Sequence, residues 1–142
     1  MIKTDYSYCH SNIPTSQRHD ISVAFKEWIN DISADPDEKR IEAAERIRSF
    51  LDNPNASMLD LSRLNLTRLP FRLFKIRDFK SLQTLDLSDN RLTALPEGLE
   101  DIPGLRAIYL SNNPIRENEF KKFNRWPHSV SIFLSAYPAS KL

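Results

Sequence analysis

The feature that most constrains this chain is a repeated arrangement of leucines in its second half. Residues 82–96 read LQTLDLSDNRLTALP and follow the pattern LxxLxLxxNxLxxLP. Residues 105–115, LRAIYLSNNPI, match its first eleven positions. Residues 59–70, LDLSRLNLTRLP, match their part of it except that Leu64 takes the place of the asparagine, and residues 132–138, IFLSAYP, form a degenerate fourth copy. Repetition on this scale predicts a solenoid in which each unit packs only against its neighbours.

The spacing identifies the kind of repeat. Equivalent positions Leu59, Leu85, Ile108 and Ile132 are 26, 23 and 24 residues apart, within the roughly 20–29 residues of leucine-rich repeats. Alternate residues of the short strand in each unit point inward, and the inward residues form the core. We therefore expect an α/β solenoid, a short leucine-rich-repeat horseshoe with a parallel sheet.

The asparagines of the pattern, Asn90 and Asn113, lie where each strand turns into a loop. A side-chain amide can both donate and accept hydrogen bonds, so it can satisfy backbone groups that a tight corner leaves unpaired. Leu64 cannot do this. The first corner is therefore expected to pack through apolar contacts against an N-terminal cap.

That cap is predicted to be a helical hairpin. From Asp20, apolar residues recur at helical spacing, and these are Ile21, Ala24, Phe25, Trp28, Ile29 and Ile32. A second helix is predicted from Asp35 as cap, with Pro36 at its first position, Glu38 placed for a capping box, and a stop at residues 52–54. Its apolar stripe consists of Ala43, Ala44, Ile47, Phe50 and Leu51.

Three regions follow: a mobile polar leader (1–19), the hairpin cap (20–53), and about three regular repeats plus a degenerate one (56–142). Near the C-terminal end, a helical turn from Asn118 to Asn124 is expected to lay aromatic rings on the core, and these are Phe120, Phe123 and Trp126. The chain is either a natural short protein with an aromatic closure or a piece of something longer. A second copy could cover its open last repeat, which would make a homodimer.

Composition excludes several classes of function. The chain has 20 Lys and Arg against 19 Asp and Glu, so it gives no reason to expect nucleic acid as a partner. No apolar run approaches the roughly 18 residues of a membrane span, and the first 20 residues have no apolar core of secretory type. Cys9 is the only cysteine, which fits a reducing compartment. We expect no catalytic residue, metal site or cofactor: Cys9 and His10 are adjacent in the leader, and the histidines lack metal-ligand spacing.

Three segments together resemble a known family, the leucine-rich-repeat effectors that Gram-negative pathogens inject into host cells, including the novel E3 ubiquitin ligase group. The segments are FKEW at 25–28, RIEAAERI at 40–47, and the opening repeat at 59–70 with Leu64 in the asparagine position. The resemblance covers about residues 20 to 115. It departs from the family in its longer repeats, and because Cys9 is followed by His10 and Ser11 rather than by the Cys-x-Asp setting of the ligases.

The resemblance implies a partner-recognition role without enzymatic activity, as an effector that binds a host protein after secretion into the host cell cytoplasm. One alternative is the substrate-recognition part of an E3 ubiquitin ligase that lacks its catalytic domain. Another is a purely structural repeat protein of the bacterium itself that stays in the bacterial cytoplasm. The expected partner is accordingly a host protein or an intracellular protein.

The partner is expected on the concave face, where outward residues of successive strands form columns. One column is Asp60, Asp86, Tyr109 and Phe133, in which the aromatic residues are candidate anchors. A serine column (Ser62, Ser88, Ser111, Ser135) is expected to be small for close stacking. The other candidate partner-binding residues are Arg63, Asp89, Asn112, Gln83 and Arg106. A basic stretch in the first-repeat tail is either a solvated convex face or a site for an acidic partner or anionic lipid, and it comprises Arg68, Arg72, Lys75, Arg77 and Lys80.

Overall fold

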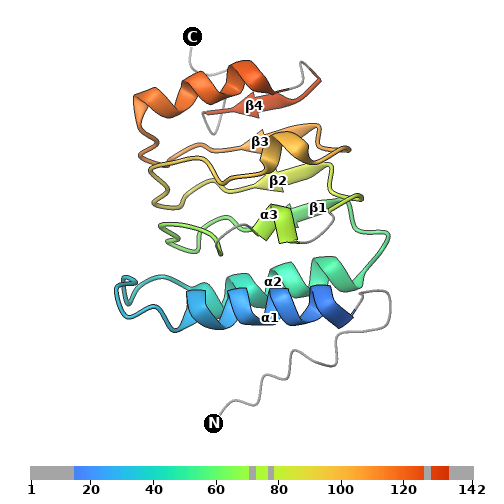
Figure 1. Ribbon diagram of the computed structural model, residues 1–142. Coiled ribbons are helices and arrows are strands. Elements are labelled where there is room, and N and C mark those ends of the chain that lie inside the picture. The colour runs from blue at the N-terminus through green and yellow to red at the C-terminus, as the bar shows by residue number, and fades with distance from the viewer. Residues whose placement is uncertain (1–14, 71–72, 77–78, 127–128, 135–142) are drawn as a thin grey trace.

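The computed structural model describes residues 15–70, 73–76, 79–126 and 129–134. Two helices come first, α1 (Thr15–Ile29) and α2 (Arg40–Asp52). The repeats then supply β1 (Met58–Asp60), α3 (Leu73–Ile76), β2 (Thr84–Asp86), η2 (Leu99–Asp101), β3 (Ala107–Tyr109), η3 (Glu117–Arg125) and β4 (Ser131–Phe133). Figure 1 shows the strands stacked in chain order above the two helices.

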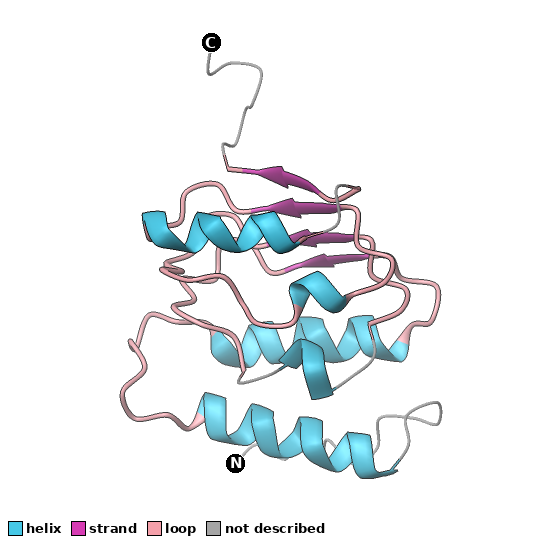
Figure 2. Cartoon of the chain, turned by 45° about the horizontal axis from the view of Figure 1, so that its top comes forward, coloured by secondary structure: helices cyan, strands magenta, loops and turns pink. Residues whose placement is uncertain are grey.

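The strands form one parallel sheet in the order β1-β2-β3-β4. Leu59 pairs with Leu85, Leu85 with Ile108, and Ile108 with Ile132, so equivalent repeat positions lie side by side. Figure 2 shows the strands as one layer with helical segments beside it. The predicted leucine-rich-repeat solenoid is confirmed, and the degenerate fourth copy contributes β4. Residues 135–138 of that copy lie outside the described residues.

The core follows from the alternation within each strand. The middle residue of β1, β2 and β3 is buried, as is the leucine two positions later, because both point to the inner side of the sheet. Leucines of the returning segments, such as Leu92 and Leu95, close over them. A unit alone would leave this apolar surface in water, so the units stabilise one another by stacking.

The Asn90 side chain joins two successive corners, as its position predicts. Its Oδ1 atom accepts hydrogen bonds from the backbone N–H groups of Leu64 (3.1 Å) and Leu66 (3.0 Å). Its Nδ2 group donates to the carbonyls of Leu61 and Leu87, both at 2.9 Å. Asn113 repeats the arrangement one unit later and bonds to Leu92, Leu87 and Leu110 among others. These amides therefore connect neighbouring units as well as closing their own turns.

Leu64, which replaces the first asparagine, is 1% exposed. Its carbonyl accepts a 2.9 Å hydrogen bond from the backbone N–H of Lys39, in the segment that joins the two helices. The first corner is therefore apolar and covered from the N-terminal side, as predicted.

Both helices of the cap differ from the predicted bounds. Helix α1 begins at Thr15, before the predicted start at Asp20, and α2 begins at Arg40, after the predicted start next to Asp35. The Glu38 carboxylate does accept the backbone N–H of Asp35, which is half of a capping box. The Lys39 N–H bonds to Leu64 rather than back along its own segment, so the first turn cannot become helical there. Ile32, predicted on the apolar stripe, lies in this segment and is fully exposed.

Several of the other predicted apolar positions are buried as expected. In α1, Phe25 and Trp28 are buried, and in α2 the buried residues include Ala43, Ile47 and Phe50. The division into leader, cap and repeats stays a prediction, because residues 1–14 lie outside the described ranges.

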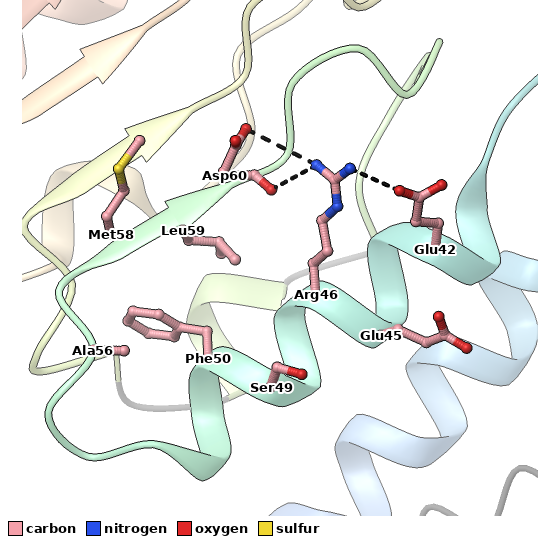
Figure 3. Close-up of a pocket in the computed structure, with 9 residues that line it drawn as sticks. All are labelled: Glu42, Glu45, Arg46, Ser49, Phe50, Ala56, Met58, Leu59 and Asp60. Atoms are coloured by element: carbon pink, nitrogen blue, oxygen red, sulfur yellow. Dashed lines mark hydrogen bonds and ion pairs between the residues drawn. The ribbon is translucent and has the colours of Figure 1, made fainter.

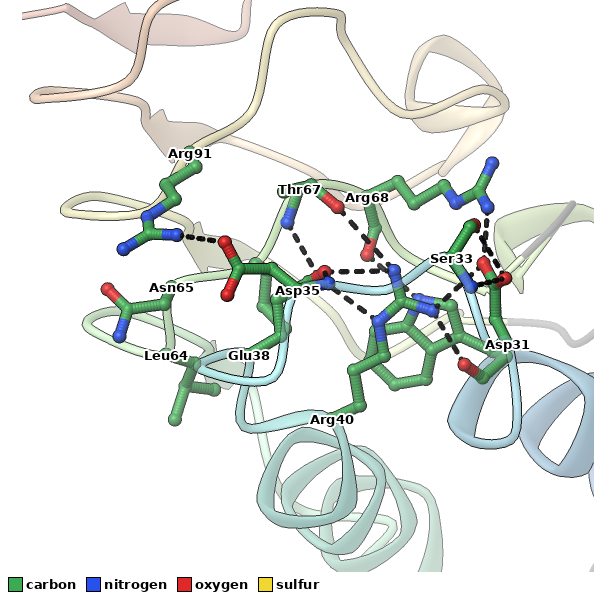
Figure 4. A network of polar contacts seen from close by, with 12 residues as sticks. Asp31, Ser33, Asp35, Glu38, Arg40, Leu64, Asn65, Thr67, Arg68 and Arg91 are labelled. Carbon is green, nitrogen blue, oxygen red and sulfur yellow. Dashed lines mark hydrogen bonds and ion pairs between the residues drawn. The ribbon is translucent and has the colours of Figure 1, made fainter.

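A buried arginine ties the hairpin to the first repeat (Figure 4). The Arg40 side chain is 4% exposed and pairs with Glu38, with Nε 3.0 Å from Oε1. It also donates to the carbonyl of Trp28 at 2.6 Å and lies 5.1 Å from the centre of the Trp28 ring. Trp28 in turn donates from its indole N–H to the Arg68 carbonyl, and Glu38 accepts the Thr67 N–H. These contacts, the Arg40 clamp, give a buried charge the partners that its burial requires.

The rim of the clamp carries further ion pairs. Asp31 faces Arg68, and Arg91 of the second repeat reaches Asp35 at 2.7 Å. Hydrogen bonds from the Ser33 hydroxyl and N–H, and then from Arg68, hold the pKa of Asp31 well below its usual range. Burial raises the pKa of Glu38, but hydrogen bonds from Arg40, Thr67 and Asp35 outweigh it, so the net shift is downward.

At the other end, η3 carries the predicted aromatic closure as a 3-10 helix. Trp126 is buried, and its ring meets that of Phe123 edge-on at 5.0 Å. Phe120 lies 5.7 Å from Phe123. The Glu119 carboxylate accepts the Leu95 N–H at 2.9 Å and so joins η3 to the second repeat. No helix in the described part of the chain is long and apolar enough to cross a membrane.

Replacing Asn90 with alanine should lower the free energy of unfolding by about 3 kcal/mol, because the N–H groups of Leu64 and Leu66 and the Leu61 carbonyl lose the bonds that the amide makes to them. Urea denaturation monitored by circular dichroism measures this. Asn118→Ala, on the exposed side of η3, is the matched control and should change stability by less than about 0.5 kcal/mol. Equal effects of the two substitutions would contradict the role assigned to the Asn90 amide.

Acid should weaken the Arg40 clamp. The folded-state pKa values of Asp31 and Glu38 are lowered, so their contribution is present above the ordinary carboxyl range and is lost as pH falls through the folded values. The free energy of unfolding should decrease between about pH 6 and about pH 3. This decrease should be smaller in Glu38→Gln than in the wild type or in Glu117→Gln, which alters an exposed carboxylate of η3. A parallel decrease in all three proteins would show that Glu38 makes no such contribution.

Candidate functional site

The outward face of the sheet consists of two rows of side chains. The first row is Met58, Thr84, Ala107 and Ser131, and the second row is Asp60, Asp86, Tyr109 and Phe133. The second row is the column predicted from the repeat pattern, and its members are register partners on adjacent strands. The first row was missed as a separate row, although the same alternation of strand residues predicts it. Because Ala107 and Ser131 are small, the Tyr109 and Phe133 rings stand beside a lower strip of surface.

The carboxylates of the second row also close the turns that follow their strands. Asp60 Oδ1 accepts hydrogen bonds from the Ser62 N–H (2.9 Å) and hydroxyl (2.6 Å). Asp86 Oδ1 makes the same pair of bonds with Ser88, at 3.0 and 2.6 Å. Two members of the predicted serine column, Ser62 and Ser88, therefore donate hydrogen bonds to the carboxylates of this row. Burial raises the pKa of Asp60, but the Ser62 bonds and the Arg46 and Arg63 charges give a net lowering.

The aromatic half of the row is a stacked pair. The rings of Tyr109 and Phe133 lie 4.6 Å apart with an angle of 12° between their planes. This separation is close to the roughly 4.8 Å between neighbouring strands. The two rings therefore stack along the direction in which the strands follow one another.

The loop column of Arg63, Asp89 and Asn112 is held by its own contacts. The Arg63 guanidinium lies 3.6 Å from the Asp89 carboxylate, which also accepts the Asn112 amide at 2.6 Å. All three have positive φ angles, 61°, 59° and 58°. Asp and Asn adopt this conformation more readily than other non-glycine residues, so Arg63 is the unusual member. Arg63 is also highly exposed, with 82% of its side chain accessible.

Gln83 and Arg106 precede their strands and are both exposed. Their backbones are neighbours, because the Arg106 N–H donates to the Gln83 carbonyl at 2.8 Å. The structure thus brings the nine predicted residues together as three groups: the second row, the loop column, and this pair. Whether they bind a partner stays a prediction.

A groove that sequence reasoning missed lies between α2 and β1, beside the acidic end of the second row (Figure 3). It has a volume of about 560 Å³ and is lined by Glu42, Glu45, Arg46, Ser49, Phe50, Ala56, Met58, Leu59 and Asp60. Arg46 bridges its two sides, 2.7 Å from Glu42 and 3.9 Å from the Asp60 carboxylate. The Glu42–Arg46 spacing was visible in the sequence, but the reach of Arg46 to β1 depends on how the hairpin docks.

The outward face presents carboxylate, guanidinium, amide and aromatic side chains, which are groups that can bind a partner. In the part of the chain that the structure describes, no three His, Cys, Asp or Glu side chains gather as a metal site would require. Cys9, His10 and His128 lie outside the described residues, as do Arg72 and Arg77 of the basic stretch. Arg68, the first member of that stretch, pairs with Asp31.

Comparisons with known proteins agree with the repeat assignment. Residues 54–115 match the family model described as leucine rich repeat. Mouse (Mus musculus) Podocan is 40% identical over 101 residues, which cover 68% of this chain and 16% of Podocan. The solved structure of a Shigella effector LRR domain is 35% identical, with a TM-score of 0.54, over 67% of this chain and 38% of that one. YopM from Yersinia enterocolitica is 21% identical over 82% of this chain and 32% of YopM, but its TM-score of 0.40 is too low to support a conclusion.

This chain therefore spans only a small part of Podocan and well under half of the Shigella domain. Residues 54–115 are leucine-rich repeats, a fold that typically presents a concave surface to other proteins. The chain is similar both to an animal protein, Podocan, and to a bacterial effector domain.

Proposed function

We propose that this chain is a non-enzymatic protein-binding module, delivered by a bacterium into a host cell, where it binds one host protein through the outward face of its sheet. The observation that carries the proposal is the second row, Asp60, Asp86, Tyr109 and Phe133, presented on a leucine-rich-repeat sheet. In this row two half-buried aromatic rings are stacked beside two carboxylates.

The composition of the row suits a protein partner. Aromatic side chains bury much area with little loss of conformational entropy, and they are enriched among the residues that dominate binding energies. Four strands about 4.8 Å apart make a row roughly 14 Å across. That width accommodates one face of a helix or a short extended segment. The backbone beneath it is held by the Asn90 and Asn113 bonds, so little ordering would be needed on binding.

The bacterial part of the proposal rests on two observations. The Shigella domain with similar structure belongs to an effector. In addition, the hairpin segments at 25–28 and 40–47, which resemble the effector family, supply Trp28 and Arg40 of the Arg40 clamp. The Shigella match is to a leucine-rich-repeat domain and does not bear on ligase activity, so the ligase alternative stays a prediction. The proposed homodimer also stays one, because the residues after 134 lie outside the described ranges.

Removing the row's central charge and ring should strongly reduce capture of the partner. In pull-downs from host-cell lysate analysed by mass spectrometry, Asp86→Asn combined with Tyr109→Ala should reduce recovery of the specific partner about tenfold or more. Asparagine keeps the oxygen that accepts the Ser88 bonds, so the turn is preserved. Lys121→Ala, an exposed change on η3, is the control and should capture as the wild type does. Full recovery by a folded double variant would refute binding through this face.

Delivery is tested separately. A translocation reporter fused after residue 30 and expressed in a secretion-competent Gram-negative pathogen should reach the host cytoplasm. The same fusion should stay in the bacterium when the injection apparatus is inactivated. Retention in both strains would favour a protein that acts inside the bacterium.

A further inference from the structure

One carboxylate on the outward face differs from its neighbours in having no cation beside it. Asp60 lies 3.9 Å from Arg46, and Asp89 lies 3.6 Å from Arg63. Asp86 is on β2, and among the described residues no Lys, Arg or His nitrogen comes within 4.0 Å of its carboxylate. Its Oδ1 atom accepts hydrogen bonds from the N–H and the hydroxyl of Ser88. Within the same residues, Oδ2 has no hydrogen-bond partner, although the side chain is only half-exposed.

An aromatic wall stands next to this carboxylate. Tyr109 is the register partner of Asp86 on β3, and Phe133 is the partner of Tyr109 on β4. The Phe133 ring covers one face of the Tyr109 ring in a nearly parallel stack. The opposite face of Tyr109 is therefore turned toward β2. There the shorter Asp86 side chain is its neighbour, so a half-buried carboxylate on β2 and a half-buried ring on β3 adjoin; the notch is this pair, with the carboxylate as its floor and the ring as its wall.

We propose that this notch, which we call the Asp86–Tyr109 notch, receives an arginine side chain of the protein partner. The inference rests on the proposed function, since it names the group by which the partner would be recognised. A guanidinium lying on the outward face above β2 would stack against the free face of Tyr109 and donate hydrogen bonds to Asp86 Oδ2. Such an arginine would supply the cation that Arg46 and Arg63 supply to the neighbouring carboxylates.

Arginine fits the notch better than other cations. Its planar guanidinium stacks on an aromatic face while it directs donors sideways to a carboxylate, and a lysine ammonium cannot do both in one plane. A metal ion would need more ligands than the notch has, since no cluster of three candidate ligands is present in the described residues. Asp60, one strand away, adds negative potential that favours a cation on approach.

The first row beside the notch consists of small side chains on β2 and β3. Ala107 and Thr84 lie next to Tyr109 and Asp86 on the same strands, and both side chains are small. An incoming backbone can pass over them without meeting a long side chain. Met58, at the β1 end of the same row, is half-exposed and offers an apolar contact to the residue that follows the arginine.

The test uses the full 142-residue chain labelled with ¹⁵N and three peptides: acetyl-Gly-Arg-Gly-amide, its lysine counterpart and its citrulline counterpart. At low salt, the arginine peptide should shift the backbone signals of Asp86 and Tyr109 saturably, with a dissociation constant in the millimolar range. The lysine and citrulline peptides should bind about tenfold more weakly, because one lacks the planar group and the other lacks the charge.

Variants assign the effect to the notch. Asp86→Asn and Tyr109→Leu should each weaken the arginine peptide about tenfold, whereas Tyr109→Phe should stay within about twofold because it keeps the ring face. Asp101→Asn, an exposed carboxylate on η2, is the matched control and should have no effect. Dispersion of the backbone signals is checked for each variant as evidence that it is folded. If Asp86→Asn does not fold, the comparison of Tyr109→Leu with Tyr109→Phe still tests whether the ring face binds the arginine peptide.

Three results would overturn the notch: equal binding of the arginine and lysine peptides, equal weakening by Asp101→Asn, or no saturable shift at Asp86 and Tyr109. A chain that captures a host protein through its outward face but shows any of these results would retain the proposed function without the notch. Conversely, a chain that shows the arginine-selective shifts but captures no host protein would retain the notch without the proposed function.

Discussion

The register between repeats is the constraint on which the rest of this structure depends, and Asn90 is the residue that enforces it most directly. Its amide bonds to backbone groups on both sides of the interface between the first and second units. A shift of one residue in either strand would break these bonds and turn the inward leucines toward solvent. The same register places Asp60, Asp86, Tyr109 and Phe133 side by side. The candidate binding surface therefore depends on the same strand register that buries the leucines of the core.

A solenoid has two open ends, and in this chain the N-terminal end is built differently from the corners between repeats. In the first repeat, Leu64 stands at the position where later repeats have an asparagine, so this corner is apolar and has no amide to bond to a preceding repeat. The hairpin covers that corner, but its packing brings Arg40 into the interior. An unpaired buried guanidinium would be strongly destabilising, so Glu38, the Trp28 ring and the Trp28 carbonyl must all be in place at once. This requirement fixes the position of the cap as well as adding contacts.

The hairpin also affects the binding surface. Because α2 is held against β1, Arg46 can reach the Asp60 carboxylate and offset its charge. Asp86 has no such neighbour among the described residues. The docking of the cap thus makes the two acidic members of the second row chemically different, and it leaves the uncompensated one beside Tyr109. In the proposed notch, selectivity for a partner would follow in part from this contact at the edge of the sheet.

The sequence by itself determined the repeats, the parallel strands, the inward leucines, the amide corners and the membership of the second row. These properties depend on periodicity, and a period of about 24 residues with alternation inside each strand is visible without coordinates. Only the tertiary structure decided where α2 begins, which arginine is buried, and which carboxylate lacks a cation. Lys39 bonds to Leu64, Arg40 reaches Thr67, and Arg46 reaches β1, all across segments distant in the chain. Long charged side chains can adopt many conformations, and burial and the neighbouring charges in the folded structure determine which one is favoured.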